Sequence, residues 1–180
     1  GYIGIEDNKP EAVSKLKEAF KNVPEVSVEA LPTKYPQGAE KMLIKAVTDR
    51  EVQPGGLPMD VGCVVSNVGT VIAITDAVCH GIPFIERVTT VTGDCIKEPK
   101  NLRLRIGTSF QYAVDYCGGF SAQPDRVIAG GPMMGLAQFQ LDVSVAKGVS
   151  GILALSPEKC QVGVEDPCIR CGRCVDACPM

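Results

Sequence analysis

The chain has 180 residues, of which 45% are apolar and 22% charged, and its formal net charge is −3. These values are ordinary for a soluble globular protein of one or two domains. The acidic balance argues against nucleic-acid binding, which usually relies on a basic surface. Tryptophan is absent and aromatic residues make up only 5%, so platforms for stacking bases are not expected either.

Strand and helix signals alternate over the first eighty or so residues. The predicted strands are 2–5, 26–31 and 63–65, and the predicted helices are 11–21, 38–48 and 68–79. Such alternation favours an α/β layer. The apolar run 61–79 contains Asn67 and Asp76, which would be costly inside a bilayer. We therefore expect a buried helix of a soluble domain there, and no membrane span.

The pattern changes after Pro83. Strands are predicted at 85–92, 102–106, 125–129 and 151–155, with one helix at 110–117. Two strands, a helix and further strands predict a small α+β unit of β-grasp type. The segment 130–135 has the sequence GGPMMG, in which proline removes an N–H that a phosphate-binding loop would need. We expect a turn of the β-grasp unit there, with Met133 and Met134 packed.

Nine cysteines fall into two groups. Five are scattered, and buried or neutral positions are expected for them because free cysteine is among the most buried residue types. The other four form the pattern C-x2-C-x2-C-x3-C-P and are Cys168, Cys171, Cys174 and Cys178. This is the pattern of bacterial [4Fe–4S] ferredoxins. Two-residue gaps let one tight loop present thiolates to several corners of a cubane cluster.

Zinc is the main alternative to iron–sulfur chemistry. Structural zinc sites usually draw their ligands from two separated pairs, whereas these four cysteines lie within eleven residues and the single histidine, His80, is far away. Reactive thiols are a weaker alternative. A disulfide framework is disfavoured because no signal peptide opens the sequence, and a reducing compartment fits better.

The ends of the sequence suggest a piece of a longer protein. Gly1 opens inside a predicted strand, and Met180 directly follows a motif that normally continues. In two-cluster ferredoxins the fourth cysteine of the motif binds the other cluster. We therefore expect residues beyond Met180 to complete the cluster that includes Cys178.

Several stretches together resemble the C subunit of the Rnf electron-transport complex, a ferredoxin:NAD(+) oxidoreductase. Besides the cysteine motif they are GIEDNKP at 4–10, YPQGAEK at 35–41, GGLP at 55–58, NVGT at 67–70, ERVT at 86–89, TG at 92–93 and GGPMMG at 130–135. That family is in turn similar to the flavin- and NADH-binding subunit of respiratory complex I.

The resemblance implies a division into modules. Residues 1–82 look like the C-terminal part of an α/β domain that binds FMN and NADH. Residues 83–140 resemble a soluble-ligand-binding β-grasp (SLBB-type) domain. Residues 141–164 would be a linker, and 165–180 the start of a ferredoxin-type [4Fe–4S] domain.

The implied function is that of an electron-transfer subunit in an ion-translocating oxidoreductase. Electrons would pass between NADH, FMN and two [4Fe–4S] clusters of the full-length protein and, through partner subunits, ferredoxin. The chain would lie peripherally on the cytoplasmic side of the membrane, and the piece alone would be inactive. A cobalamin reductase of related architecture, and a ligand-binding module with a structural metal, are the alternatives.

The resemblance also implies flavin-adjacent residues. The segment 35–41 is similar to a flavin-adjacent stretch of the complex I relative, and 67–70 to another. The residues implied are Tyr35, Gly38, Glu40, Lys41, Asn67 and Thr70. Asn67 could equally cap the following helix, and Glu40 could lie on a solvated helix face. The glycine-rich loop that cradles the FMN phosphate in these relatives is missing here, so the flavin site is expected to be incomplete.

Overall fold

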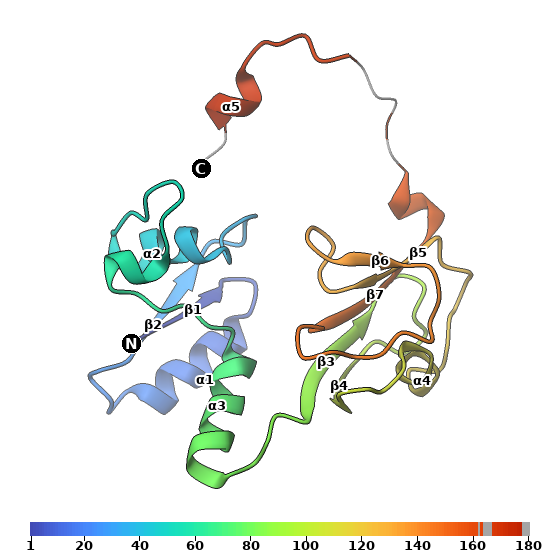
Figure 1. The fold of residues 1–180 in the computed structure, drawn as a ribbon, viewed down its shortest axis with the longest axis horizontal. Coiled ribbons are helices and arrows are strands. Elements are labelled where there is room, and N and C mark those ends of the chain that lie inside the picture. Colours follow the sequence, from blue (N-terminus) through green and yellow to red (C-terminus); the bar gives the residue numbers. More distant parts are fainter. Residues whose placement is uncertain (162, 164–166, 178–180) are drawn as a thin grey trace. The chain divides into compact units, whose positions relative to one another are not determined.

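The computed structural model describes residues 1–161, 163 and 167–177, which form two compact units (Figure 1). The first unit comprises Gly1–Ser66 and the C-terminal segment that begins at Gly172, and the second comprises Asn67–Cys171. Each unit is built around its own β-sheet.

The first unit is a βαβ element with helices packed against it. Strand β1 (Tyr2–Glu6) pairs in parallel with β2 (Ser27–Leu31), and α1 (Pro10–Phe20) connects the two strands. Pro10 opens α1, where the missing N–H costs nothing. The remaining elements are α2 (Glu40–Thr48) and the short 3-10 helix η1 (Pro58–Val61).

Helix α2 packs closely against β1 at Gly4. A Cβ on Gly4 would lie 2.7 Å from Leu43 Cδ1 and 3.1 Å from Leu31 Cδ1. The approach of α2 leaves Ile44 only 2% exposed, and Gln37 in the preceding turn is 8% exposed. These two are the buried residues of the described part of the first unit, whose core is therefore small.

The second unit contains a five-stranded mixed sheet. Its strands are β3 (Glu86–Thr92), β4 (Lys100–Arg105), β5 (Arg126–Ala129), β6 (Leu136–Gln138) and β7 (Gly151–Leu155). The order across the sheet is β4-β3-β7-β5-β6, with β7 parallel to β3 and antiparallel to β5. The strand at 151–155, inside the segment expected to be a linker, is thus the central strand.

Helix α4 (Phe110–Tyr116) packs against this sheet and forms the core with it. Phe110, Ala113 and Val114 are buried in one cluster with alternate residues of the strands, among them Val91 and Ile152. Period-two alternation places one face of each strand on the core. A mixed sheet covered by a single helix is the β-grasp arrangement that the sequence predicted.

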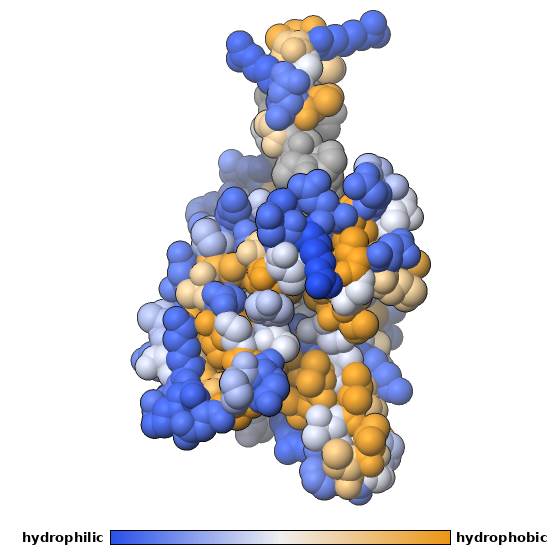
Figure 2. All heavy atoms as spheres, turned by 90° about the vertical axis from the view of Figure 1, so that its left-hand side faces the viewer, coloured by the Kyte–Doolittle hydropathy of each residue, from blue (hydrophilic) through white to orange (hydrophobic). Residues whose placement is uncertain are grey.

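Helix α3 (Val68–His80) precedes the sheet and is not the buried helix that we expected. None of its residues is buried, and Val68 and Val78 are 67% and 79% exposed. It is mostly apolar but has no pronounced apolar stripe, so no single face directs it onto a neighbour. Uncovered apolar side chains are also visible between polar ones on the molecular face drawn in Figure 2.

Two further expectations were wrong. Residues 63–65 form no strand, and Val64 is 89% exposed, because β-branched residues make a strand only where a neighbouring strand offers hydrogen bonds. Segment 130–135 is a turn as predicted, and it joins β5 to β6, but Met133 and Met134 are 65% and 79% exposed instead of packed. Both residues lie in the connection between the two strands and not in the sheet itself.

The 3-10 helix η2 (Pro157–Cys160) follows β7, and the last described element is α5 (Arg173–Ala177). None of the helices in the part of the chain that the structure describes is long and apolar enough to cross a bilayer.

Candidate functional site

The cysteine motif lies on an exposed loop that runs into α5. Cys168 and Cys171 lie in the loop, Cys174 lies in the first turn of α5, and all three are exposed free thiols. Cys178, the fourth predicted ligand, falls outside the described residues. Among the residues that are described, no three His, Cys, Asp or Glu side chains are gathered as a metal site, so the cluster stays a prediction.

The backbone of this loop nevertheless has features that suit thiolate ligands. The N–H of Arg170 donates to Cys168 Sγ at an N···S distance of 3.4 Å. Arg170 and Gly172 both have left-handed conformations, with φ of 56° and 77°. Left-handed turns expose successive N–H groups that bind anions, and such concavities occur at many Fe–S sites. The donor set, which consists of thiols with an N–H aimed at one sulfur, therefore fits an iron–sulfur cluster.

The predicted flavin residues of the first unit surround the turn before α2. Tyr35, Gly38 and Glu40 are exposed, with Glu40 the first residue of α2. A Cβ on Gly38 would meet nothing within 4 Å, and its backbone is not left-handed. Lys41 Nζ donates to the carbonyl oxygen of Gln53 at 3.1 Å. Tyr35, Gly38 and Glu40 are therefore open to a ligand, whereas the Lys41 side chain also holds a neighbouring loop.

Asn67 and Thr70 lie at the start of α3 in the second unit. Asn67 is the N-cap, and its Oδ1 accepts from the N–H of Gly69 at 2.9 Å. The capping role, one of the two interpretations of this residue, is thus observed, and it leaves the side-chain NH₂ free for a second partner. Thr70 is exposed in the first turn.

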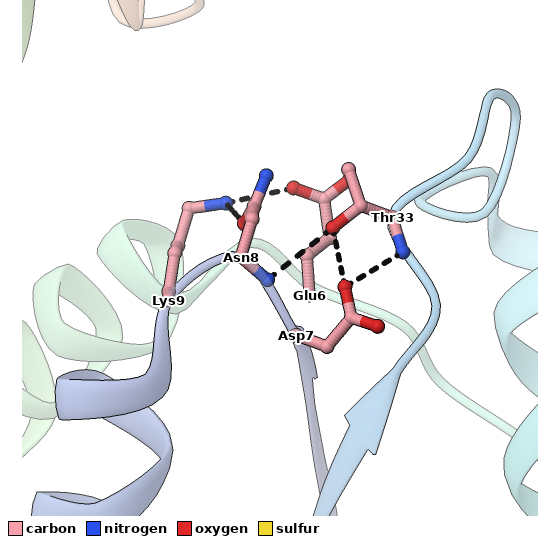
Figure 3. Close-up of polar contacts among 5 residues, drawn as sticks. All are labelled: Glu6, Asp7, Asn8, Lys9 and Thr33. Atoms are coloured by element: carbon pink, nitrogen blue, oxygen red, sulfur yellow. Dashed lines mark hydrogen bonds and ion pairs between the residues drawn. The ribbon is translucent and has the colours of Figure 1, made fainter.

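A further polar network joins the carboxyl ends of β1 and β2 (Figure 3). Asp7 Oδ1 accepts from the hydroxyl of Thr33 at 2.7 Å and from its backbone N–H at 3.0 Å. These bonds hold the pKa of Asp7 below its ordinary value. Lys9 Nζ pairs with Glu6 at 2.7 Å beside them. Ligands of open α/β sheets bind at the carboxyl ends of parallel strands, yet here the carboxylate and the hydroxyl already satisfy each other.

Sequence reasoning did not identify this network, because Asp7 and Thr33 are 26 residues apart. The acidic and polar run at 6–9 directly after a strand was the available signal. A shallow groove lined by Asp7, Pro10 and Val13 lies next to it on α1.

The five scattered cysteines range from buried to exposed. Cys95 and Cys117 are buried in the β-grasp core, and burial raises the pKa of both thiols. Burial also raises the pKa of Cys160. Cys79 is exposed, since it lies on α3, and Cys63 is partly exposed.

Two domain families match the chain in the predicted order. A model of the Nuo51 FMN-binding domain matches residues 1–76, and a model of the SLBB domain matches residues 88–137. The second match lies within the β-grasp sheet described above.

Relatives match the chain along almost its whole length. It is 60% identical over 99% of its residues to the C subunit of a proton-translocating ferredoxin:NAD(+) oxidoreductase complex from Clostridium ljungdahlii. It is 51% identical over its full length to the C subunit of the Na(+)-translocating complex from Acetobacterium woodii. This chain is homologous to these C subunits. The C subunit of an ion-translocating oxidoreductase complex from Vibrio cholerae is 45% identical over 99% of the chain.

These matches confirm the resemblance that the sequence motifs suggested. The chain spans 39% and 41% of the first two relatives and 23% of the Vibrio protein. All three relatives are parts of ion-translocating oxidoreductase complexes, so the cobalamin reductase alternative is not favoured.

Proposed function

We propose that this chain is part of the electron-transferring C subunit of an ion-translocating ferredoxin:NAD(+) oxidoreductase complex. The observation that carries the proposal is the cysteine loop. Its thiols have the ferredoxin spacing and are exposed, and the N–H of Arg170 donates to Cys168 Sγ. The identity of 60% to a subunit of such a complex over nearly the whole chain supports it.

The proposed division of labour follows the two domain families. Residues 1–82 form the C-terminal part of an FMN- and NADH-binding domain. The SLBB-type domain begins at residue 83 and, because β7 is the central strand of its sheet, extends past the predicted boundary at 140 to Leu155. The ferredoxin-type module starts at 165, with Cys168, Cys171, Cys174 and Cys178 as ligands of two [4Fe–4S] clusters in the full-length protein. A flavin takes electrons as a pair and releases them singly, as clusters require.

The residues proposed to contact FMN in the complete protein fall in both units, and each set is considered by itself. In the first unit they are Tyr35, Gly38, Glu40 and Lys41, around the turn before α2. In the second unit they are Asn67 and Thr70, at the start of α3. The open space over Gly38 supports this role, because nothing in its own fold requires glycine there. Since the phosphate-cradling loop is not in this sequence, the 180-residue chain alone is expected to be inactive.

We infer a peripheral position on the cytoplasmic side of the membrane, next to other subunits of the complex and reached by ferredoxin only through them. The named relatives are subunits of ion-translocating complexes, and free thiols such as those of the motif persist in reducing compartments.

Metal analysis of the complete gene product tests the cluster. Purified without oxygen, it should hold iron and acid-labile sulfide in equal amounts, at two cubane clusters per chain, and give an electron paramagnetic resonance (EPR) signal when reduced. Cys171→Ser should lose iron, whereas Cys79→Ser, which alters an exposed cysteine outside the motif, should keep it. Zinc without sulfide would refute the proposal and favour a structural metal.

A further inference from the structure

Arg170, which lies between two of the motif cysteines, has an unusual backbone conformation. Its φ is 56°, and Asp49 is the other non-glycine residue of the described chain with positive φ. Asp49 ends α2 and belongs to the short polar residues that visit this region. Arginine has no such preference, and a left-handed conformation costs an ordinary residue free energy.

The strained residue makes a specific contact. The N–H of Arg170 reaches Cys168 Sγ with an N···S distance of 3.4 Å. Gly172 turns the chain a second time, and its carbonyl oxygen accepts from the N–H groups of Val175 and Asp176 as α5 begins. The guanidinium of Arg170 is exposed, and no hydrogen bond or ion pair of this side chain is found among the described residues. Among the described residues, Arg170 therefore contacts the motif through its backbone N–H and not through its guanidinium.

We propose that Arg170 is a positioning residue for the cluster bound by Cys168: its left-handed backbone holds the N–H on Cys168 Sγ, which raises the cluster's reduction potential and slows loss of iron. This inference rests on the proposed function, because it presupposes the cluster. Hydrogen bonds to the sulfurs are among the features that set the potentials of such clusters. A donor stabilises the more negative, reduced state more than the oxidised state.

The test separates the backbone of Arg170 from its charge in the complete gene product. Arg170→Val removes the charge and disfavours the left-handed conformation, since β-branched residues rarely adopt positive φ. Arg170→Gly removes the same charge but adopts that conformation freely. Arg173→Gln removes an exposed charge three residues away and leaves the turn untouched. The readouts are the midpoint potential by EPR-monitored titration and the rate of iron release to a chelator.

The inference requires Arg170→Val to differ from the other two variants. Its potential should fall below theirs, and iron should leave roughly tenfold faster, the factor that a hydrogen bond to a charged acceptor is worth. Failure of Arg170→Val alone to retain iron would support the inference too. If Arg170→Val and Arg170→Gly match in both readouts, the backbone has no such role. A wild-type protein without iron and sulfide would instead overturn the proposed function itself.

Discussion

Gly93 joins β3 to the following turn at a point where the chain has no room for a side chain. Its φ is 122°, and a Cβ there would overlap the carbonyl oxygen of Ala154 in β7. Gly107 also has positive φ, at 97°, but a Cβ there would meet nothing within 4 Å. A substitution of Gly107 therefore introduces backbone strain alone, whereas a substitution of Gly93 in the same domain introduces backbone strain and steric overlap.

We expect Gly107→Ala to cost about 1–3 kcal/mol of the free energy of unfolding, from the left-handed backbone alone. Gly93→Ala should cost more, because overpacking adds about 1–3 kcal/mol. Urea unfolding of both variants measures the difference. Equal destabilisation would contradict the overlap with β7.

Asp7 ties β1 to β2 through Thr33. Because these hydrogen bonds hold the pKa of Asp7 below its ordinary value, its contribution to stability is complete above the pKa of the unfolded chain. That contribution is lost as the pH falls through the lower pKa of the folded state. NMR titration should find this low midpoint, and Thr33→Val should raise it by removing one donor. An unchanged midpoint in Thr33→Val would show that the hydroxyl bond does not act on the carboxylate.

Gly38 offers a direct test of the proposed flavin surface. Since a Cβ at this position meets nothing, Gly38→Val should leave the unfolding free energy almost unchanged. If FMN approaches the turn, the same variant should lower the FMN content of the complete gene product. Gly148→Val is the matched control, because Gly148 is equally open and lies in the other unit. Full FMN content in Gly38→Val would remove Gly38 from the site.

Helices α1, α2 and α4 and most strands were predictable because local signals agree with the tertiary contacts. The N-cap Ser109 accepts from the N–H of Tyr112 at 3.2 Å, and Phe110, Ala113 and Val114 recur at helical spacing on the buried face of α4. Strand β6 escaped notice because it is three residues long and exists only by pairing with β5. The strand expected at 63–65 had suitable residues but no partner.

The cysteine motif was visible in the sequence because spacing alone encodes a loop of ligands. The left-handed turn at Arg170 was not visible, since arginine carries no signal for positive φ. The exposure of α3 was not visible either. A mostly apolar helix predicts burial, yet the sequence does not say which residues cover it.

The two units differ in how much core they possess. Thirteen buried residues form one cluster in the β-grasp unit, whereas the described part of the first unit buries Gln37 and Ile44. Because burial of apolar surface is the main source of stability, the two units should open with different free energies even though they share one chain.

Amide hydrogen exchange on the 180-residue chain measures this difference. Amides of β3, β5 and β7 should exchange slowest, since these strands lie inside the sheet. Among the helices, α1 and α3, which bury no residue, should exchange faster than α4. A ligand that binds only the folded state adds stability, so FMN should slow exchange in α2 of the complete gene product and leave β7 unchanged. Exchange of α1 as slow as that of β7 would show that the first unit is stabilised by more than its small core.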